Sequence, residues 1–292
     1  MDDSISALNS IQIVRAGVIA VYCLSIYEWL ETLSDEVDLV YPSRWNSVKL
    51  AYFLCRYYPL LVWPTVIYAY VENHTAQTCA KLTPAVSYAL LPMQSFAQGV
   101  MLMRAYAFAG RNVKILFVLC SCYAGLLGVN IWFFCTQVVP LPDETYEILG
   151  GTGCFPDYAA SGGTLHLIVG MAAAILMDLV SLSIIAIYCL RKRSIQGSLG
   201  RTFINQGLFA FGVVIAVQSV SLGTYFNPAG YHNGVGLPYI LVIPNLIACR
   251  LILDLRRKAL PTETQILRRN SLLVDNAFAS SDLWTIAEDG WR

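Results

Sequence analysis

The sequence predicts an all-α fold: a polytopic bundle of seven transmembrane helices, with the N-terminus outside and the C-terminus in the cytosol. The 292-residue chain is 57% hydrophobic and only 13% charged, whereas a soluble domain usually carries about 25% charged residues. It contains seven long apolar segments, and the Lys and Arg residues gather on alternate loops between them. Because the net charge is zero, the composition also excludes a basic nucleic-acid-binding protein.

Each apolar segment is long enough to cross a bilayer, which requires about 20 residues in a helix. The segments lack the two-residue alternation of β-barrel strands, so helices are expected. The predicted spans are residues 12–30, 48–70, 84–108, 114–134, 164–190, 201–222 and 236–255. They divide the chain into a short outside N-terminus (1–11), a membrane domain (12–255) and a partly disordered cytosolic tail (256–292).

The spans have different sequence features. The first follows Asp2 and Asp3 rather than basic residues, and no small-residue cleavage site comes after it, so we interpret it as a retained helix and not a signal peptide. The second, third and seventh contain prolines, which permit bends in membrane helices. The fourth ends in aromatic residues from Trp132, as expected at a membrane boundary. The fifth holds Asp178 near its middle, and the sixth follows a basic loop.

The orientation follows from the cations, because loops rich in Lys and Arg stay in the cytosol. With the N-terminus outside, 14 of the 19 Lys and Arg residues are cytosolic, four lie within or at the ends of spans, and Lys81 alone lies in an outside loop. The cytosolic set is Arg44, Lys49, Arg111, Lys114, Arg191, Lys192, Arg193, Arg201, Arg256, Arg257, Lys258, Arg268, Arg269 and Arg292.

Cys79 and Cys154 are candidates for a disulfide bond. Both would lie on the oxidising face of the membrane, one just before the third span and one in the long loop after the fourth. A bridge between them would fix this loop over the outer mouth of the bundle. Two alternatives remain open at this point: both thiols are free, or Cys135 takes one of the partners.

Five ionisable residues are expected to form a polar cluster within the membrane: Glu28, Arg56, Arg104, Asp178 and Arg250. Charges at membrane depth cost about 2.5–3.5 kcal/mol each, so they face the bundle interior or a cavity. Asp178 is the deepest, and pairing with Arg56 or Arg250 would offset its burial. Alternatively, the arginines snorkel to the interface and only Asp178 is buried.

No motif for a cofactor, metal or soluble enzyme emerges from the sequence. The three histidines lack the spacing of a zinc site, and the seventh span has no lysine for a retinal Schiff base. We therefore expect no cofactor and no bound metal. Asn73 begins a glycosylation sequon in an outside loop, and Ser271 follows two arginines in the tail, as in sites of basophilic kinases.

One part of the sequence resembles the opening signature of a known family. It begins with the segment from Tyr27 to Val40 and continues with several later residues. The later residues are Arg44-Trp45, Lys49 and Arg56-Tyr57. The family is a large fungal, chiefly basidiomycete, group of seven-helix membrane proteins whose N-terminal region is known only as a domain of unknown function. The resemblance covers residues 21–66, with two later pieces at 104–107 and 250–256. Tyr41 departs from it, since the family often has Trp there. The resemblance implies an architecture and no activity.

The leading functional hypothesis is a receptor-like sensor. Arg104 and Tyr106 loosely resemble the Asp-Arg-Tyr triplet of G-protein-coupled receptors, although Met103 replaces the acid and the Tyr is displaced by one residue. The basic residues Arg191, Lys192 and Arg193 precede the sixth span. Together these five residues are candidates for coupling to a cytosolic partner such as a heterotrimeric G protein.

Other functions remain open. A small-solute or proton-coupled transporter would use Asp178 and the intramembrane arginines as a relay. A membrane lipid hydrolase or a scaffold protein is also compatible with the sequence. In each case the bilayer is the expected surrounding, in the plasma membrane or another membrane of the secretory pathway. No nucleic acid is expected as a partner, and the sequence names no ligand.

Overall fold

The computed structural model describes residues 2–110, 112–136, 138–143, 153–157, 163–191, 198–225, 236–259 and 271. Within these ranges the chain is helical and contains no β-strand. The helices are α1 (Asp2–Glu31), α2 (Leu33–Leu39), α3 (Ser47–Val71), α4 (Ala76–Phe108), α5 (Val113–Thr136), α7 (Gly163–Arg191), α8 (Ser198–Tyr225) and α9 (Leu237–Ala259).

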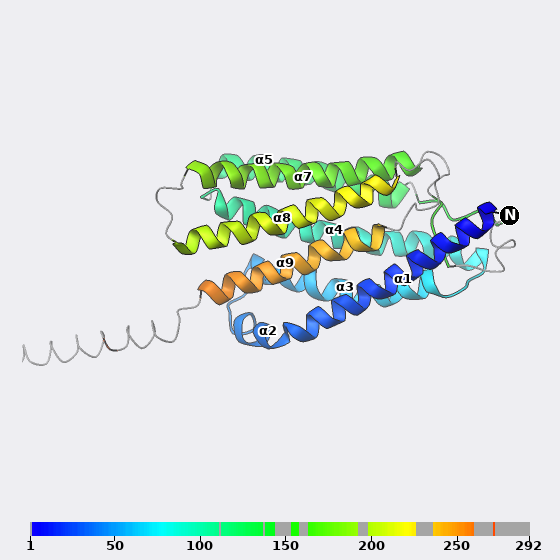
Figure 1. Cartoon of the computed structure of the whole chain (residues 1–292), viewed down its shortest axis with the longest axis horizontal. Coiled ribbons are helices and arrows are strands. Elements are labelled where there is room, and N and C mark those ends of the chain that lie inside the picture. Colours follow the sequence, from blue (N-terminus) through cyan, green and yellow to red (C-terminus); the bar gives the residue numbers. More distant parts are fainter. Residues whose placement is uncertain are drawn as a thin grey trace, which may run out of the picture.

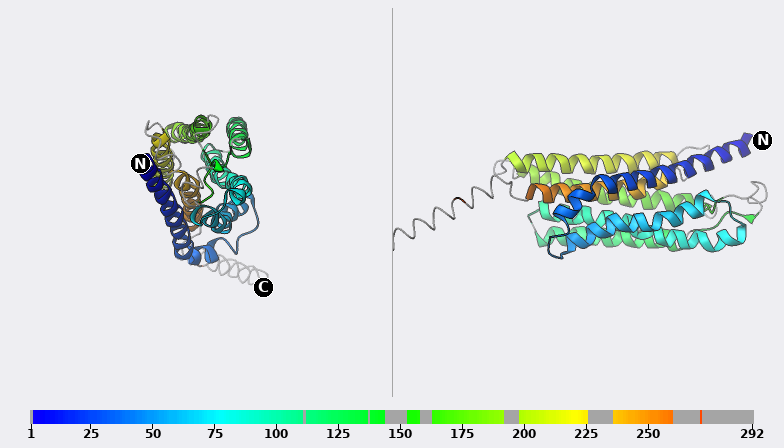
Figure 2. Two further views of the ribbon diagram at one scale, coloured as in Figure 1. Left: turned by 90° about the vertical axis from the view of Figure 1, so that its right-hand side faces the viewer. Right: turned by 90° about the horizontal axis from the view of Figure 1, so that it is seen from below.

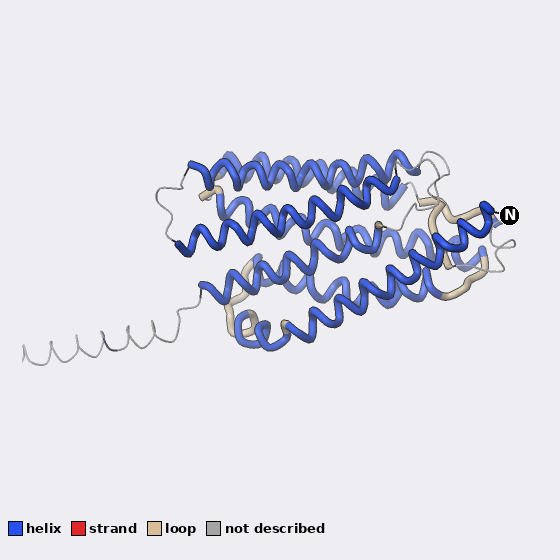
Figure 3. The backbone as a smooth tube through the Cα atoms, viewed as in Figure 1, coloured by secondary structure: helices blue, strands red, loops and turns tan. Residues whose placement is uncertain are grey.

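The long helices lie side by side along one axis, and the short helix α2 packs at one end of them (Figure 1). The described loops are confined to the two ends of this bundle (Figure 3). At one end, the α2 end, α2 lies near the last residues of α9. At the other end α1 begins, and a disulfide bond joins Cys79 to Cys154; we call it the disulfide end. The beginning of α1 and the end of α9 are therefore at opposite ends of the bundle.

Helix α4 is the central helix of the bundle. It packs against α3, α5, α7 and α9, while α1 packs against α3 and α9, and α8 packs between α7 and α9. The end-on view in Figure 2 shows the long helices grouped about one axis. Because four helices contact α4, it can carry buried polar residues such as Ser95 and Gln98 along its length.

Among the described residues, six helices are long and apolar enough to cross a membrane, and they coincide with six of the seven predicted spans. They are Asn9–Glu31, Ser47–Val71, Val113–Cys135, Leu167–Tyr188, Gly207–Thr224 and Leu237–Arg257. Large apolar side chains such as Leu61, Phe117 and Phe209 point outward from them, as expected for surfaces in contact with lipid. The protein is a multi-pass membrane protein. The remaining predicted span, 84–108, lies within α4, whose composition is less apolar.

The interior is held by close apolar packing with a few hydrogen bonds between helices. One buried cluster centres on Trp63, Met93 and Leu241 towards the disulfide end. The Trp63 indole donates a 2.8 Å hydrogen bond to the backbone carbonyl of Val18, which joins α3 to α1. The Asn245 amide of α9 donates to the carbonyl of Met93 in α4 at 3.0 Å. These bonds fix the rotation of the helices around the core.

Candidate functional site

The best-defined polar site is a buried ion pair between α2 and α3. The Glu36 carboxylate is completely buried, and one of its oxygens lies 2.6 Å from Nε of Arg56. The hydroxyls of Tyr52 and Tyr57 donate hydrogen bonds to the two carboxylate oxygens, at 3.2 and 2.8 Å. Tyr52 and Arg56 are four residues apart and therefore share one face of α3. Glu36, the one buried acid of α2, packs against this face.

A second set of contacts ties α9 to α1 and α2. Arg250 pairs with Glu28 at 2.6 Å and with Glu31 at 2.7 Å. Arg256 donates a 3.0 Å hydrogen bond to the carbonyl of Leu39, where α2 ends. Arg56 also reaches α1, through a 2.9 Å hydrogen bond to the carbonyl of Trp29. We call Glu28, Glu31, Glu36, Arg56 and Arg250 the α2 clamp, because together they join α1, α2, α3 and α9.

The turn between α2 and α3 is built around Lys49. Its ammonium donates 2.9 Å hydrogen bonds to the carbonyls of Tyr41 and Ser43 and lies 4.9 Å from the centre of the Trp45 ring. The Asn46 side chain accepts a hydrogen bond from the Lys49 backbone N–H and caps α3. These contacts bury Lys49. The Trp45 ring, in contrast, is exposed at the surface of the α2 end.

The structure divides the predicted intramembrane cluster among three places. Glu28, Arg56 and Arg250 line one small cavity at the clamp. Asp178 and Arg104 lie elsewhere, so the predicted pairing of Asp178 with Arg56 or Arg250 is wrong. Both arginines are engaged by glutamates of α1 and α2, which reach them from the neighbouring helices.

Asp178 is fully buried between α4, α7 and α8. The Gln98 amide of α4 donates a 3.2 Å hydrogen bond to its Oδ2, and the Gln218 side chain of α8 also hydrogen-bonds to the carboxylate. Neither glutamine was predicted from the sequence as a partner of Asp178. Their signal was present, since an amide within a long apolar span has to find a buried partner.

Arg104 lies near the α2 end, beside an apolar pocket of about 300 Å³. The pocket is lined by Val48 of α3, Val100, Met103 and Phe108 of α4, and Leu251 and Ile252 of α9. The guanidinium carbon lies 5.5 Å from the centre of the Phe108 ring, and Asp254 of α9 interacts with it electrostatically. On its other side it packs against Gly207 of α8, where an added Cβ would lie only 2.9 Å from Nη2.

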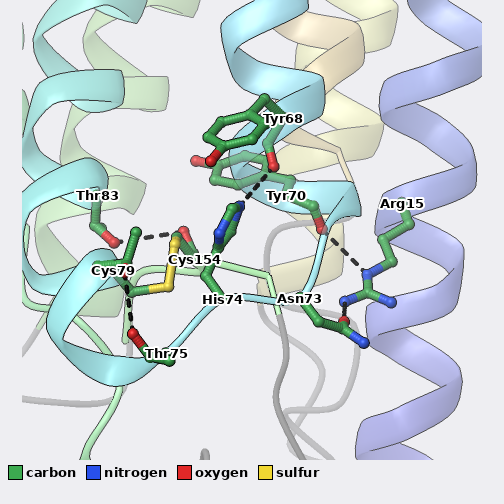
Figure 4. The surroundings of a disulfide bond; sticks show 10 residues. Arg15, Tyr68, Tyr70, Asn73, His74, Thr75, Cys79, Thr83 and Cys154 are labelled. Carbon is green, nitrogen blue, oxygen red and sulfur yellow. Dashed lines mark hydrogen bonds between the residues drawn. A yellow bond between two sulfur atoms is a disulfide. The ribbon is translucent and has the colours of Figure 1, made fainter.

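At the disulfide end, the structure joins Cys79 at the start of α4 to Cys154 in the loop after α5 (Figure 4). The Cys154 N–H donates a 2.8 Å hydrogen bond to the carbonyl of Ala69, so the loop is also attached to α3. A Cβ on Gly153 would collide with the carbonyl of Tyr70. Cys135, the alternative partner, is a free thiol.

At the same end of the bundle, Arg15 of α1 contacts the end of α3 and the loop that follows it. Its guanidinium donates hydrogen bonds to the carbonyl of Tyr70 at 3.1 Å and to the Asn73 side chain at 2.8 Å. Figure 4 shows Arg15 reaching from α1 towards these two residues. The exposed sequon residue Asn73 is therefore engaged by a cation of the neighbouring helix.

The other predicted residues lie towards the α2 end or beyond the described ranges. Tyr106 is partly buried near the end of α4, and Ser271 is exposed. Arg191 is the last residue of α7, while Lys192 and Arg193 lie outside the described residues. Of the predicted tail, 256–292, the structure describes only 256–259 and 271.

Comparison with protein families gives one match. Residues 18–61 match a family of unknown function, DUF6533. The matched segment contains the second half of α1, all of α2 and the first part of α3, and so it includes four of the five clamp residues. No curated protein matches the chain. The match confirms that the opening segment carries the signature of a family, and that family has no assigned function.

Proposed function

We propose that the protein is a receptor-like sensor with seven membrane-spanning helices, whose α2 end faces the cytosol and docks a signalling partner. In this proposal α4, the third helix of the seven in chain order, also crosses the membrane, since its 33 residues exceed the length that a bilayer requires. Its neighbours α3, α5, α7 and α9 shield its polar side chains from lipid. Seven crossings are consistent with the beginning of α1 and the end of α9 lying at opposite ends of the bundle (Figure 1).

The distribution of cations supports the orientation. At the α2 end lie Arg44, Lys49, Lys114, Arg256 and Arg257, whereas the disulfide end holds Arg15 and Lys81 among the described residues. Loops rich in Lys and Arg remain in the cytosol. The disulfide between Cys79 and Cys154 would then lie on the oxidising side, where such bonds persist.

The observation that carries the receptor hypothesis is the apolar pocket beside Arg104. It opens at the α2 end between α3, α4 and α9, and a buried guanidinium lies at its edge. An apolar recess next to a fixed cation suits an amphipathic helical segment of a partner. Because Arg104 also packs against Gly207, movement of α8 away from α4 would alter both the guanidinium and the pocket.

A heterotrimeric G protein is the first partner to test. We expect membranes containing the protein to accelerate guanine-nucleotide exchange on the Gα subunits of the same host, and Arg104→Ala to abolish the acceleration. Arg257→Ala is a matched control, because this arginine lies at the same end but its side chain is 69% exposed. Ala107→Trp, which would fill the pocket from α4, should act like Arg104→Ala. Equal exchange with the wild type and both pocket variants would contradict the proposal.

The second candidate is a small-solute or proton-coupled transporter. It is favoured by the burial of Asp178 among polar side chains of three helices, because intramembrane carboxylates commonly line ion pathways. Reconstituted vesicles would test it: Asp178→Asn should abolish uptake or proton movement while the protein still folds. Transport that is unchanged in this variant would exclude the relay.

A further inference from the structure

Several oxygen atoms around Asp178 have no hydrogen-bond partner within the described part of the chain. They are Oδ1 of Asp178, Oγ of Ser181, Oε1 of Gln98 and Oε1 of Gln218. All four side chains are buried, with 3% or less of their surface exposed. They come from the three helices α4, α7 and α8. Buried polar atoms without a hydrogen-bond partner are rare in folded proteins, and each calls for an explanation such as a bound water or ion.

These oxygens belong to one cluster. Both glutamines hydrogen-bond to the Asp178 carboxylate, and the oxygen of an amide is bonded to the same carbon as its nitrogen. Each Oε1 is therefore close to the carboxylate. Ser181 follows Asp178 by three residues, so the two side chains share one face of α7. The two carboxylate oxygens differ, since Oδ2 accepts from Gln98 whereas Oδ1 has no donor.

Among the described residues, the cluster carries one negative charge, and no ion pair involves Asp178. Arg56 is paired with Glu36, and Arg250 is paired with Glu28 and Glu31 at the α2 clamp. An unpaired carboxylate in a low-dielectric interior is strongly unfavourable. A monovalent cation would neutralise the site, whereas a divalent cation would leave an excess positive charge buried in its place.

We propose that Asp178, Ser181, Gln98 and Gln218 form a sodium-binding site in the interior of the bundle. The donor set consists of oxygen atoms, which suits a hard cation rather than a transition metal. One cation can be coordinated by all four oxygens at once. A proton on Oδ1 would also neutralise the carboxylate, and the Ser181 hydroxyl can itself donate to one glutamine oxygen. The comparison of NaCl with choline chloride below distinguishes the two.

A bound sodium ion would join α4, α7 and α8, because each helix supplies at least one of its ligands. The same α4 and α8 meet again towards the α2 end, where Arg104 packs against Gly207. The ion therefore holds together the two helices whose contact lies beside the apolar pocket. This site is independent of the receptor proposal, since its occupancy can be measured without any signalling partner.

The test uses the purified full-length chain in nanodiscs of neutral lipid. Binding of ²²Na⁺ is measured directly, and thermal unfolding is compared in NaCl, KCl and choline chloride at equal ionic strength. We expect saturable ²²Na⁺ binding by the wild type and a melting temperature that rises by about 2–4 °C in saturating sodium relative to choline. Asp178→Asn should remove both effects. The control Asp38→Asn, at an exposed acid of α2, should retain both.

A second variant keeps the test valid if Asp178→Asn alters folding. Ser181→Ala removes one neutral ligand and should weaken ²²Na⁺ binding at least several-fold while the chain still folds. The proposal is overturned if the wild type binds no ²²Na⁺, or if Asp178→Asn binds it as tightly as the wild type. Stability that changes with pH but is equal in NaCl and choline chloride would assign the site to a proton and also overturn the proposal.

Discussion

The buried ion pair between Glu36 and Arg56 is predicted to be the most important polar contact for the stability of the α2 end. Glu36→Ala removes the acid and leaves Arg56 buried beside two tyrosine hydroxyls. The Arg56 side chain is only 6% exposed, so water cannot replace the lost carboxylate. We expect α2 to detach from α3 and the whole chain to lose stability.

The magnitude follows from the burial of both partners. Removing one partner of a buried ion pair costs about 3–5 kcal/mol, because it leaves an uncompensated charge. Glu36 also accepts two tyrosine hydrogen bonds, which places the loss towards the upper part of this range. Arg250→Ala provides a comparison, since its side chain is 51% exposed. Exposed pairs contribute about 0–1 kcal/mol, so this variant should be much milder.

The assay is thermal unfolding of the purified protein in detergent, followed by tryptophan fluorescence. Glu36→Ala should lower Tm by roughly 10 °C, and Arg250→Ala by only a few degrees. The double variant Glu36→Leu/Arg56→Met removes both charges and should recover most of the loss, because apolar residues of similar size replace buried pairs well. A Glu36→Ala effect no larger than that of Arg250→Ala would refute the reasoning.

Three further predictions concern close contacts elsewhere in the bundle. Gly207→Val should overpack the interface with Arg104, cost about 1–3 kcal/mol and alter nucleotide exchange if the pocket couples; unchanged Tm and exchange would contradict the contact. Cys79→Ser or Cys154→Ser should cost about 2–4 kcal/mol, and maleimide labelling of the denatured wild type should detect two more thiols after reduction than before. Gly153→Val should displace the loop from α3 and increase proteolytic cleavage there, whereas unchanged cleavage would show that the loop adapts.

The membrane class and most of the spans follow from local composition alone. Long continuous apolar segments such as those in α5 and α7 are expected in the lipid bilayer. There they form helices, because the peptide groups of a spanning segment have no water to hydrogen-bond with. Hydropathy is a local and nearly additive property, so it can be read from the segment alone.

Which charges meet, in contrast, depends on how the helices pack together. The sequence indicates that Arg56 and Asp178 are both buried groups in need of a partner, and the prediction was that Asp178 pairs with Arg56 or Arg250. The partner of Arg56 is Glu36, one acid among several in α2, and the partners of Asp178 are glutamines of α4 and α8. Such choices depend on the rotation and depth of helices that are distant in sequence. These are fixed by side-chain packing across the whole bundle, which hydropathy and spacing along one segment do not encode.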